Sequence, residues 1–374
     1  MILIDLSTKL SFGVDVDDVW RYTGRKEPKS IILPHLLSVE LPEGSILERM
    51  EEQFLAGRGE STGDPVQAAV DFLADGASDL GVEFVRCWFP WRFFEPNMLQ
   101  GTDLKSVEEQ GYADYPFDRM VNSLQKKNIS VIPVLACGYS RMLPAGLDPD
   151  KHPDEYIRRA AIHTGALVRH YRGIVPVWQI ENEPNWWEMH VAGGWRSGAV
   201  WLEGGEFRNE LLRVLNETVH EEDPSARTMI NLEADTNVSG ADYYAKLCDI
   251  IGLDYYPNYK ASSPVDASPL ANASRVAKGI ERPVIIAETG YPSGPLLLGY
   301  TEDKQAEYIR RACACAFESE GVTAIGVWRF MDSPWRSFPD QENHFGLIDE
   351  KGRRKESFTI YSDTITEIRK ARHG

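Results

Sequence analysis

The chain repeats one pattern eight times: a short apolar segment followed by a longer segment with helical periodicity. The short segments are rich in Val and Ile and apolar on both faces, which is typical of parallel strands buried on two sides. They are SFGVDV (11–16), VEFVRCW (82–88), SVIPVLA (130–136), VPVWQI (175–180), RTMINL (227–232), CDIIGLD (248–254), PVIIAE (283–288) and TAIGVW (323–328). This alternation predicts an α/β protein built on a parallel sheet.

Helical segments separate the expected strands. Val66, Ala69, Val70 and Leu73 are spaced so that they share one helical face. Further helices are expected at 115–127, 153–171, 206–221, 240–247, 266–280, 303–319 and 355–370. Eight such pairs predict a closed (β/α)8 TIM barrel. A doubly wound open sheet is the alternative, and the absence of a glycine fingerprint after the first strand weakens it.

Two connections are much longer than the others. Residues 17–65 follow the first expected strand, and residues 184–205 follow the fourth. Both leave the C-terminal ends of strands, where barrel active sites lie, and loops of this length usually carry function. We expect a single barrel domain over residues 1–374, with 17–65 as an insertion at the barrel top.

Charge and composition limit the partners. The chain has 40 Lys+Arg against 57 Asp+Glu, a formal net charge of −17, which argues against nucleic acid and anionic membranes. Five cysteines without a CxxC pair argue against a disulfide scaffold or a structural zinc site. The start, MILIDLSTKL, lacks the basic and apolar regions of a signal peptide. We therefore expect a cytoplasmic protein, whose oligomeric state stays open.

Two of the expected strands end in glutamate. The segment VWQIENEPNWW runs from a buried strand into Glu181 and Glu183, and PVIIAETGYPSG ends its strand at Glu288. A carboxylate at the mouth of an apolar strand is costly unless it is paired or used. A surface turn explains the first segment alone, and a helix-capping glutamate explains the second alone. Together they place two carboxyl groups on one barrel face, as glycosidic cleavage requires. A retaining mechanism would need these two groups to lie about 5–5.5 Å apart.

Aromatic side chains follow the same strand ends and suit a sugar, which presents flat C–H faces and hydroxyl edges. Core filling is the alternative for any one of them. They are Trp88, Trp91, Tyr139, Trp186, Trp187, Trp195, Trp201, Tyr255, Tyr256 and Trp328. Arg86 lies inside an apolar strand, where a buried guanidinium requires an anionic partner. Glu288 is the expected partner, and an ordinary structural carboxylate is the alternative.

Several segments resemble the clan A retaining glycoside hydrolases, over about residues 80–358. The Asn182-Glu183-Pro184 run, with Glu288, resembles the two catalytic segments of that clan. VIIAETGY is similar to the nucleophile segment of family 1 β-glycosidases, and ETGYPSG to family 17 β-1,3-glucanases. The strand-6 segment of family 1 resembles IIGLDYYPNY, and its strand-8 segment resembles GVWRFMDSPW. The closing segment of that family resembles HFGLIDEKGRRKESF. VEFVRCWFPW resembles the strand-2 arginine segment of several clan members.

The resemblance implies a retaining catalytic domain that needs no metal or organic cofactor. Glu183 would be the acid/base and Glu288 the nucleophile. The residues expected to bind or position the sugar are Arg86, Asn182, Tyr256, Trp328, Trp88, Tyr139, Trp186, Trp187 and Trp335.

The family pattern also implies separate roles within this set. Asn182 would hold the sugar 2-hydroxyl, Arg86 and Tyr256 would keep the nucleophile ionised and oriented, and Trp328 would floor the −1 subsite. Two departures from family 1 leave the sugar open. ACGY stands where that family has a histidine after strand 3, and SPW stands where it has a glutamate before a tryptophan.

The expected activity is hydrolysis of β-linked oligosaccharides or glycosides, exo rather than endo. An endo-β-glycanase of the same clan and a barrel that binds glycans without cleaving them are the alternatives. Glu181 competes as the acid, because alternate side chains of a strand face the same side. A metal-dependent hydrolase is disfavoured, since the eight histidines show no HxH pair at the end of the first strand.

Overall fold

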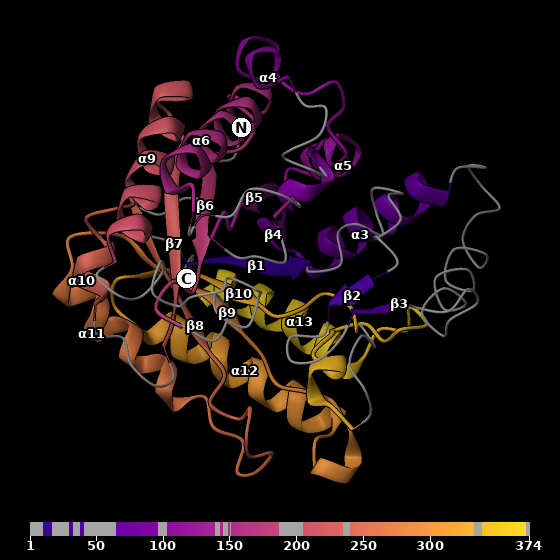
Figure 1. Ribbon diagram of the computed structural model, residues 1–374. Helices are drawn as coiled ribbons and strands as arrows, with labels where there is room; N and C mark the ends of the chain where they lie inside the picture. Colours follow the sequence, from indigo (N-terminus) through magenta and orange to yellow (C-terminus); the bar gives the residue numbers. More distant parts are fainter. Residues whose placement is uncertain are drawn as a thin grey trace.

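Eight parallel strands close into a barrel in the computed structural model, which describes residues 10–16, 30–32, 38–40, 65–95, 103–138, 143–144, 149, 151–186, 205–234, 240–332 and 339–371. Figure 1 shows the strands at the centre with helices around them. The barrel strands are β1 (Ser11–Val16), β4 (Phe84–Trp88), β5 (Ser130–Val134), β6 (Val177–Asn182), β7 (Arg227–Glu233), β8 (Ile250–Tyr255), β9 (Val284–Thr289) and β10 (Val322–Val327). The sheet closes where β1 pairs with both β4 and β10. The expected TIM barrel is thus confirmed, and the open sheet is excluded.

Helices follow the strands as the periodicity predicted. They are α3 (Pro65–Leu80), α5 (Asp118–Lys126), α6 (Pro153–His170), α9 (Glu206–Glu222), α10 (Ala241–Tyr244), α11 (Asn272–Gly279), α12 (Glu302–Glu318) and α13 (Glu356–Ala371). Ala69, Val70 and Leu73 of the expected apolar stripe are buried in α3. The segment expected at 266–280 divides into the 3-10 helix η3 (Ser268–Ala271) and α11.

One further helix, α4 (Leu104–Gln110), was not expected from the sequence. Asp103 caps its first turn by accepting a hydrogen bond from the Lys105 backbone N–H at 3.1 Å. Only Val107 of its seven residues is buried, so the segment lacks the apolar stripe that marks a longer helix. The helix packs against α6 outside the barrel.

A small second sheet lies within the expected insertion. It pairs β2 (Ser30–Ile32) with β3 (Ser38–Glu40) in antiparallel fashion. The rest of 17–64 lies outside the described residues, as does the long connection after Trp186. Their role at the barrel top therefore stays a prediction.

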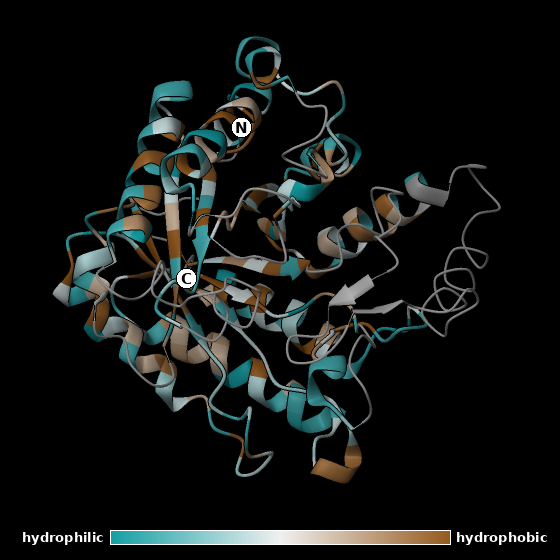
Figure 2. Cartoon of the chain, in the orientation of Figure 1, coloured by the Kyte–Doolittle hydropathy of each residue, from teal (hydrophilic) through white to brown (hydrophobic). Residues whose placement is uncertain are grey.

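The barrel interior is apolar toward the N-terminal ends of the strands. Gly13 leaves room there for the Phe84 ring, because a Cβ on this glycine would lie 2.1 Å from it. The inward cluster consists of Phe84, Ile132, Val177, Met229, Ile250, Ile285, Ala287 and Ala324. Figure 2 shows the apolar colour in the central strands and mixed bands on the surrounding helices. Such a floor fixes the strands that carry polar groups further along.

No helix in the described part of the chain is both long and apolar enough to cross a bilayer.

Candidate active site

Arg86 organises the polar layer above the apolar floor. It lies in β4 beside Asp15 of β1 and contacts that carboxylate. Its Nη1 lies 2.6 Å from Glu288 Oε1, its Nε donates to Gln179 Oε1 at 2.6 Å, and its Nη2 donates to Asn182 Oδ1 at 2.8 Å. Burial lowers the pKa of Arg86, but Glu288 and Asp15 outweigh it, so the pKa rises. The guanidinium is therefore permanently charged and faces two carboxylates.

Glu288 is held at both oxygens. It lies in β9 and is almost fully buried. One oxygen meets Arg86, and the other accepts a hydrogen bond from the Tyr256 hydroxyl at 2.7 Å. Burial, and then the charge of Glu288, raise the pKa of Tyr256 well above its ordinary value, so the phenol stays a donor. A guanidinium on one oxygen and a phenol donor on the other fix the position of this carboxylate.

Glu183 is the first residue after β6, and its backbone turns sharply. Its φ is 44°, in the left-handed region that costs a residue with a side chain about 1–3 kcal/mol. Its N–H donates to the backbone oxygen of Asn231 at 3.1 Å and to the Asn231 side chain at 3.2 Å. These two bonds over-determine the turn, as expected where strain is retained for function.

The environment of Glu183 is the opposite of that of Glu288. Burial first, and then the charge of Glu288, raise the pKa of Glu183 to about 8. Its side chain is therefore mostly protonated at neutral pH. Two neighbouring carboxyl groups, one held charged and one held neutral, form the arrangement that separates a base or nucleophile from an acid.

Asn182 joins the two halves of the network. Its Oδ1 accepts from Arg86 and, at 2.9 Å, from Asn231 Nδ2. Its own Nδ2 donates to Glu183 Oε2 over a long 3.4 Å. That weak bond leaves the amide able to donate to a ligand.

Glu181 does not lie with the other carboxyl groups, although strand alternation had made it a competing acid. The register of β6 against β7 shifts between Gln179 and Glu181, which inserts one extra residue. Gln179 and Asn182 consequently both face Arg86, and Glu181 turns away. Its carboxylate accepts from the Gly138 N–H at 2.6 Å and from the Asn182 N–H at 2.9 Å. The bulge and the left-handed φ of Glu183 together break the strand alternation, so the expectation that Glu181 and Glu183 share one side is wrong.

Four buried residues of the network were not singled out from the sequence. Each is a polar residue inside an otherwise apolar strand, the same signal that had marked Arg86. They are Asp15, Gln179, Asn231 and Asp254.

The aromatic side chains divide into two groups. Trp88 is buried above Arg86, whose guanidinium carbon lies 5.9 Å from its ring centroid. Trp328 is partly exposed at the end of β10, and Trp186 is exposed beside Glu183. Trp91 and Tyr255 belong to the main hydrophobic core, so the expectation that they line the site is wrong. Five of the aromatic residues expected near the site lie outside the described residues: Tyr139, Trp187, Trp195, Trp201 and Trp335.

Trp91 shows why a strand-end aromatic is an unreliable marker. Its ring stacks on His163 of α6 at a centroid distance of 4.9 Å. Residues that follow a strand can turn toward the helices as readily as toward the barrel axis. Core filling was the alternative for each aromatic residue, and it holds for this one.

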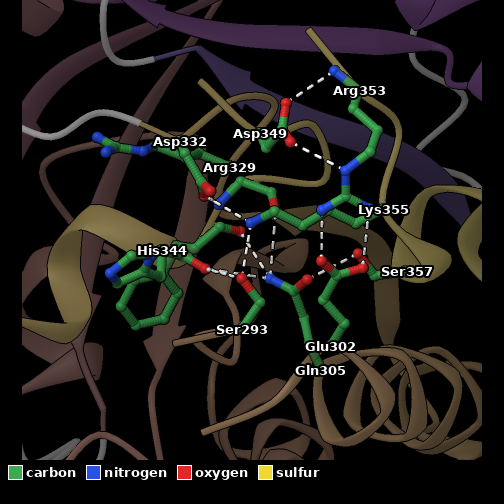
Figure 3. A network of polar contacts seen from close by, with 12 residues as sticks. Ser293, Glu302, Gln305, Arg329, Asp332, His344, Asp349, Arg353, Lys355 and Ser357 are labelled. Atoms are coloured by element: carbon green, nitrogen blue, oxygen red, sulfur yellow. Dashed lines mark hydrogen bonds and ion pairs between the residues drawn. The ribbon is translucent and has the colours of Figure 1, made fainter. Parts of the chain in front are cut away.

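A buried ion pair fixes the segment beside Tyr256. Lys355 Nζ lies 2.7 Å from both Asp332 Oδ1 and Ser293 Oγ (Figure 3). Burial raises the pKa of Asp332 to about 6 in spite of the lysine. Phe345, in the loop that this pair closes, meets the Tyr256 ring edge-on at a centroid distance of 5.7 Å. The closing segment thus supports the donor to Glu288.

Gln305 of α12 ties the same segment to the loop after β9. Its Nε2 donates to the backbone oxygen of Tyr291 at 2.9 Å and of Phe345 at 3.1 Å. Its Oε1 accepts from the Ser357 hydroxyl at 2.8 Å, as Figure 3 shows. The position of Phe345 is therefore set by a buried hydrogen bond from Gln305, which Ser357 of α13 holds in turn.

Within the described residues, no group of three or more His, Cys, Asp or Glu side chains is arranged to hold a metal ion. The functional groups around Arg86 and Glu288 are carboxyl groups, a guanidinium, amides and a phenol.

No model of a known protein family matches the sequence, and no curated protein matches it. Solved structures do match. A GH5_18 protein from Bifidobacterium longum subsp. longum aligns with a TM-score of 0.64 at 15% identity, over 97% of this chain and 80% of that one. A GH5_18 protein from Streptomyces cattleya in complex with GlcNAc has a TM-score of 0.62 at 16% identity, over 81% and 75%.

An exo-β-1,4-mannosidase from an Opitutaceae bacterium aligns with a TM-score of 0.57 at 15% identity, over 97% of this chain and 60% of that one. At these identities, the likeness shows that the chain shares the barrel fold of these proteins. The similarity of single segments to families 1 and 17 stays a prediction.

Proposed function

We propose that this protein is a retaining glycoside hydrolase that cleaves β-linked oligosaccharides or glycosides. The observation that carries the proposal is the opposite treatment of two adjacent buried carboxyl groups. Arg86 and Tyr256 hold Glu288 as a charged group, whereas burial and the charge of Glu288 keep Glu183 protonated. Double displacement requires a nucleophile and an acid of this kind.

In the first step, a carboxylate oxygen of Glu288 attacks the anomeric carbon. The glycosidic bond breaks, its electron pair goes to the leaving oxygen, and that oxygen takes the proton of Glu183. The products are a glycosyl ester on Glu288 and a free leaving group. Tyr256 holds the attacking carboxylate in place until the bond forms.

In the second step, the roles reverse. Glu288 is neutral as an ester, so its charge no longer raises the pKa of Glu183, and the ionised Glu183 can act as a base. It takes a proton from water, whose oxygen attacks the anomeric carbon. The ester electrons return to Glu288, and the sugar leaves with its original configuration.

The structural neighbours suggest which sugars to try first. GH5_18 proteins are known in complex with GlcNAc and with Manβ1-4GlcNAc, and an exo-β-1,4-mannosidase shares the fold. We therefore place β-mannosides first at the −1 subsite. Exo action on short oligosaccharides fits the cytoplasmic location expected from the sequence. Endo action of the same clan is the second candidate.

The experiment is hydrolysis of 4-nitrophenyl β-glycosides and of Manβ1-4GlcNAc, with the first-formed anomer followed by NMR. Retention gives the β-anomer first, and release of single sugars from chain ends would mark exo action. Glu288→Gln should abolish turnover. Glu183→Gln should lower kcat/KM for poor leaving groups by about 10²–10⁴-fold and spare kcat/KM for activated ones, whose slow step becomes hydrolysis of the ester. Glu210→Gln, at an exposed site on α9, is the control.

Two results would overturn the proposal. The α-anomer appearing first would make the enzyme inverting. Wild-type protein that binds the sugars without cleaving any of them would favour the glycan-binding barrel.

A further inference from the structure

A third carboxyl group lies within this network. Asp254 is in β8, and its Cα is the register partner of Glu288 in β9 and of Glu233 in β7. Its side chain is 1% exposed. The mechanism above gives it no task, although burying a carboxyl group there costs free energy.

Its hydrogen bonds are unequal at the two oxygens. Oδ2 accepts from Asn231 Nδ2, whereas Oδ1 is buried and receives no hydrogen bond from a donor in the described ranges. The Asp254 carboxyl group is instead hydrogen-bonded to that of Glu183. Two carboxyl groups can form such a bond only if one of them carries a proton.

The surrounding charges favour that proton. The charged or ionisable groups that act on Asp254 are Glu288 of β9, Glu183 just after β6 and Arg86 of β4. Arg86 is shared with Asp15 of β1, and Glu233 of β7 adds another carboxylate near Glu183. The phenol of Tyr256 is neutral and committed to Glu288. A single guanidinium therefore faces several carboxyl groups, and the like charges cannot all be maintained.

We propose that Asp254 is a positioning residue that acts as a neutral carboxylic acid, donating a hydrogen bond to the acid/base Glu183. Asn231 fixes one oxygen of Asp254 and, through its own Oδ1, the backbone N–H of Glu183. Asp254 thereby holds one oxygen of Glu183 and leaves the other free to carry the catalytic proton. After proton transfer, the same bond stabilises the Glu183 carboxylate. This inference rests on the proposed function.

The shift of both pKa values agrees with this arrangement. Burial first, and then Glu288, raise the pKa of Asp254 well above its ordinary value, and the bond with Glu183 raises it further. The same bond lowers the pKa of Glu183. Asp254 is thus the donor of this bond, and one oxygen of Glu183 is its acceptor, while the other oxygen of Glu183 carries the catalytic proton.

Two substitutions distinguish a neutral donor from an ionised carboxylate. Asp254→Asn keeps a donor of the same size, so the rate and the pH profile should stay close to those of the wild type. Asp254→Leu removes the donor. Its kcat toward poor leaving groups should fall by about 10- to 150-fold, the loss expected for one hydrogen bond to a charged group, and its alkaline limb should move to higher pH.

The opposite result is equally specific. If Asp254 is ionised, Asp254→Asn removes a negative charge beside Glu183, and the alkaline limb should move to lower pH with a loss of rate. That outcome, or an Asp254→Leu profile equal to that of the wild type, would overturn the inference.

A spectroscopic readout separates this inference from the proposed function and does not depend on Asp254→Leu folding. Besides the band of protonated Glu183, the infrared spectrum of unliganded wild-type protein at pH 7 should contain a second protonated carboxyl band, which Asp254→Asn removes. If Asp254→Asn removes this band but the protein has no glycosidase activity, the proposed function is wrong and the role of Asp254 as a neutral acid stands. If the protein is an active glycosidase but Asp254→Asn removes no such band, the role of Asp254 is wrong and the proposed function stands.

Discussion

Replacing Arg86 by methionine should destabilise the fold far more than replacing an exposed arginine. Arg86 is 1% exposed and is the cation between Asp15 and Glu288. Its removal leaves buried carboxylates without compensation, which costs about 3–5 kcal/mol. Arg213 of α9 is the matched control, since its pairs with Glu210 and Glu217 are exposed and should be worth about 1 kcal/mol or less.

Urea unfolding followed by the fluorescence of the ten tryptophans measures both changes. Adding Asp15→Leu to Arg86→Met should recover part of the loss. If Arg86→Met costs no more than Arg213→Met, the guanidinium does not hold this network together.

Three further predictions concern the rate. Glu181→Gln should keep most activity, since Glu181 is bound to Gly138 and the Asn182 backbone; loss of activity in this variant but not in Glu183→Gln would reverse the acid assignment. The rate should fall as the pH rises through about 8, because Glu183 must be protonated, and a rate still climbing at pH 9 would contradict this. Tyr256→Phe should lower kcat/KM by about 10- to 150-fold without changing the fold, and an unchanged value would show that its bond to Glu288 is unimportant.

The strands could be predicted because their residues are nearly all apolar and β-branched. Every expected barrel strand agrees with the structure to within two residues at each end. The bulge in β6 could not be predicted, because a register shift depends on the pairing with β7 rather than on the residues of β6 alone. That shift, together with the left-handed φ of Glu183, decides which of the two glutamates belongs to the site.

The missed site residues carried a readable signal. Asp254 ends the apolar run CDIIGLD as Glu288 ends PVIIAE. Both are therefore carboxyl groups at the mouth of an apolar strand. Asp15 in SFGVDV and Gln179 in VPVWQI are marked in the same way. The resemblance to family 1 assigns a role to Tyr256 and none to Asp254, which lies two residues earlier.

Aromatic residues were predicted less well. Position after a strand does not say whether a side chain turns toward the barrel axis or toward the helices. Trp88 lies over Arg86, whereas Trp91, three residues later, stacks on His163 in the core. Trp88 ends β4, whereas Trp91 begins the 3-10 helix η1 (Trp91–Phe93), and this change of backbone conformation is enough to turn the side chain toward the helices.

Covalent trapping shows directly whether Glu288 is the nucleophile. Activated 2-deoxy-2-fluoro β-glycosides of the gluco, galacto, manno and xylo series would be incubated with the protein, and any adduct mapped by peptide mass spectrometry. The fluorine slows both steps, while the good leaving group lets the first proceed, so the ester accumulates. The account predicts an adduct on Glu288 with at least one sugar. An adduct on another residue, or none from any sugar in folded protein that hydrolyses glycosides, would contradict it.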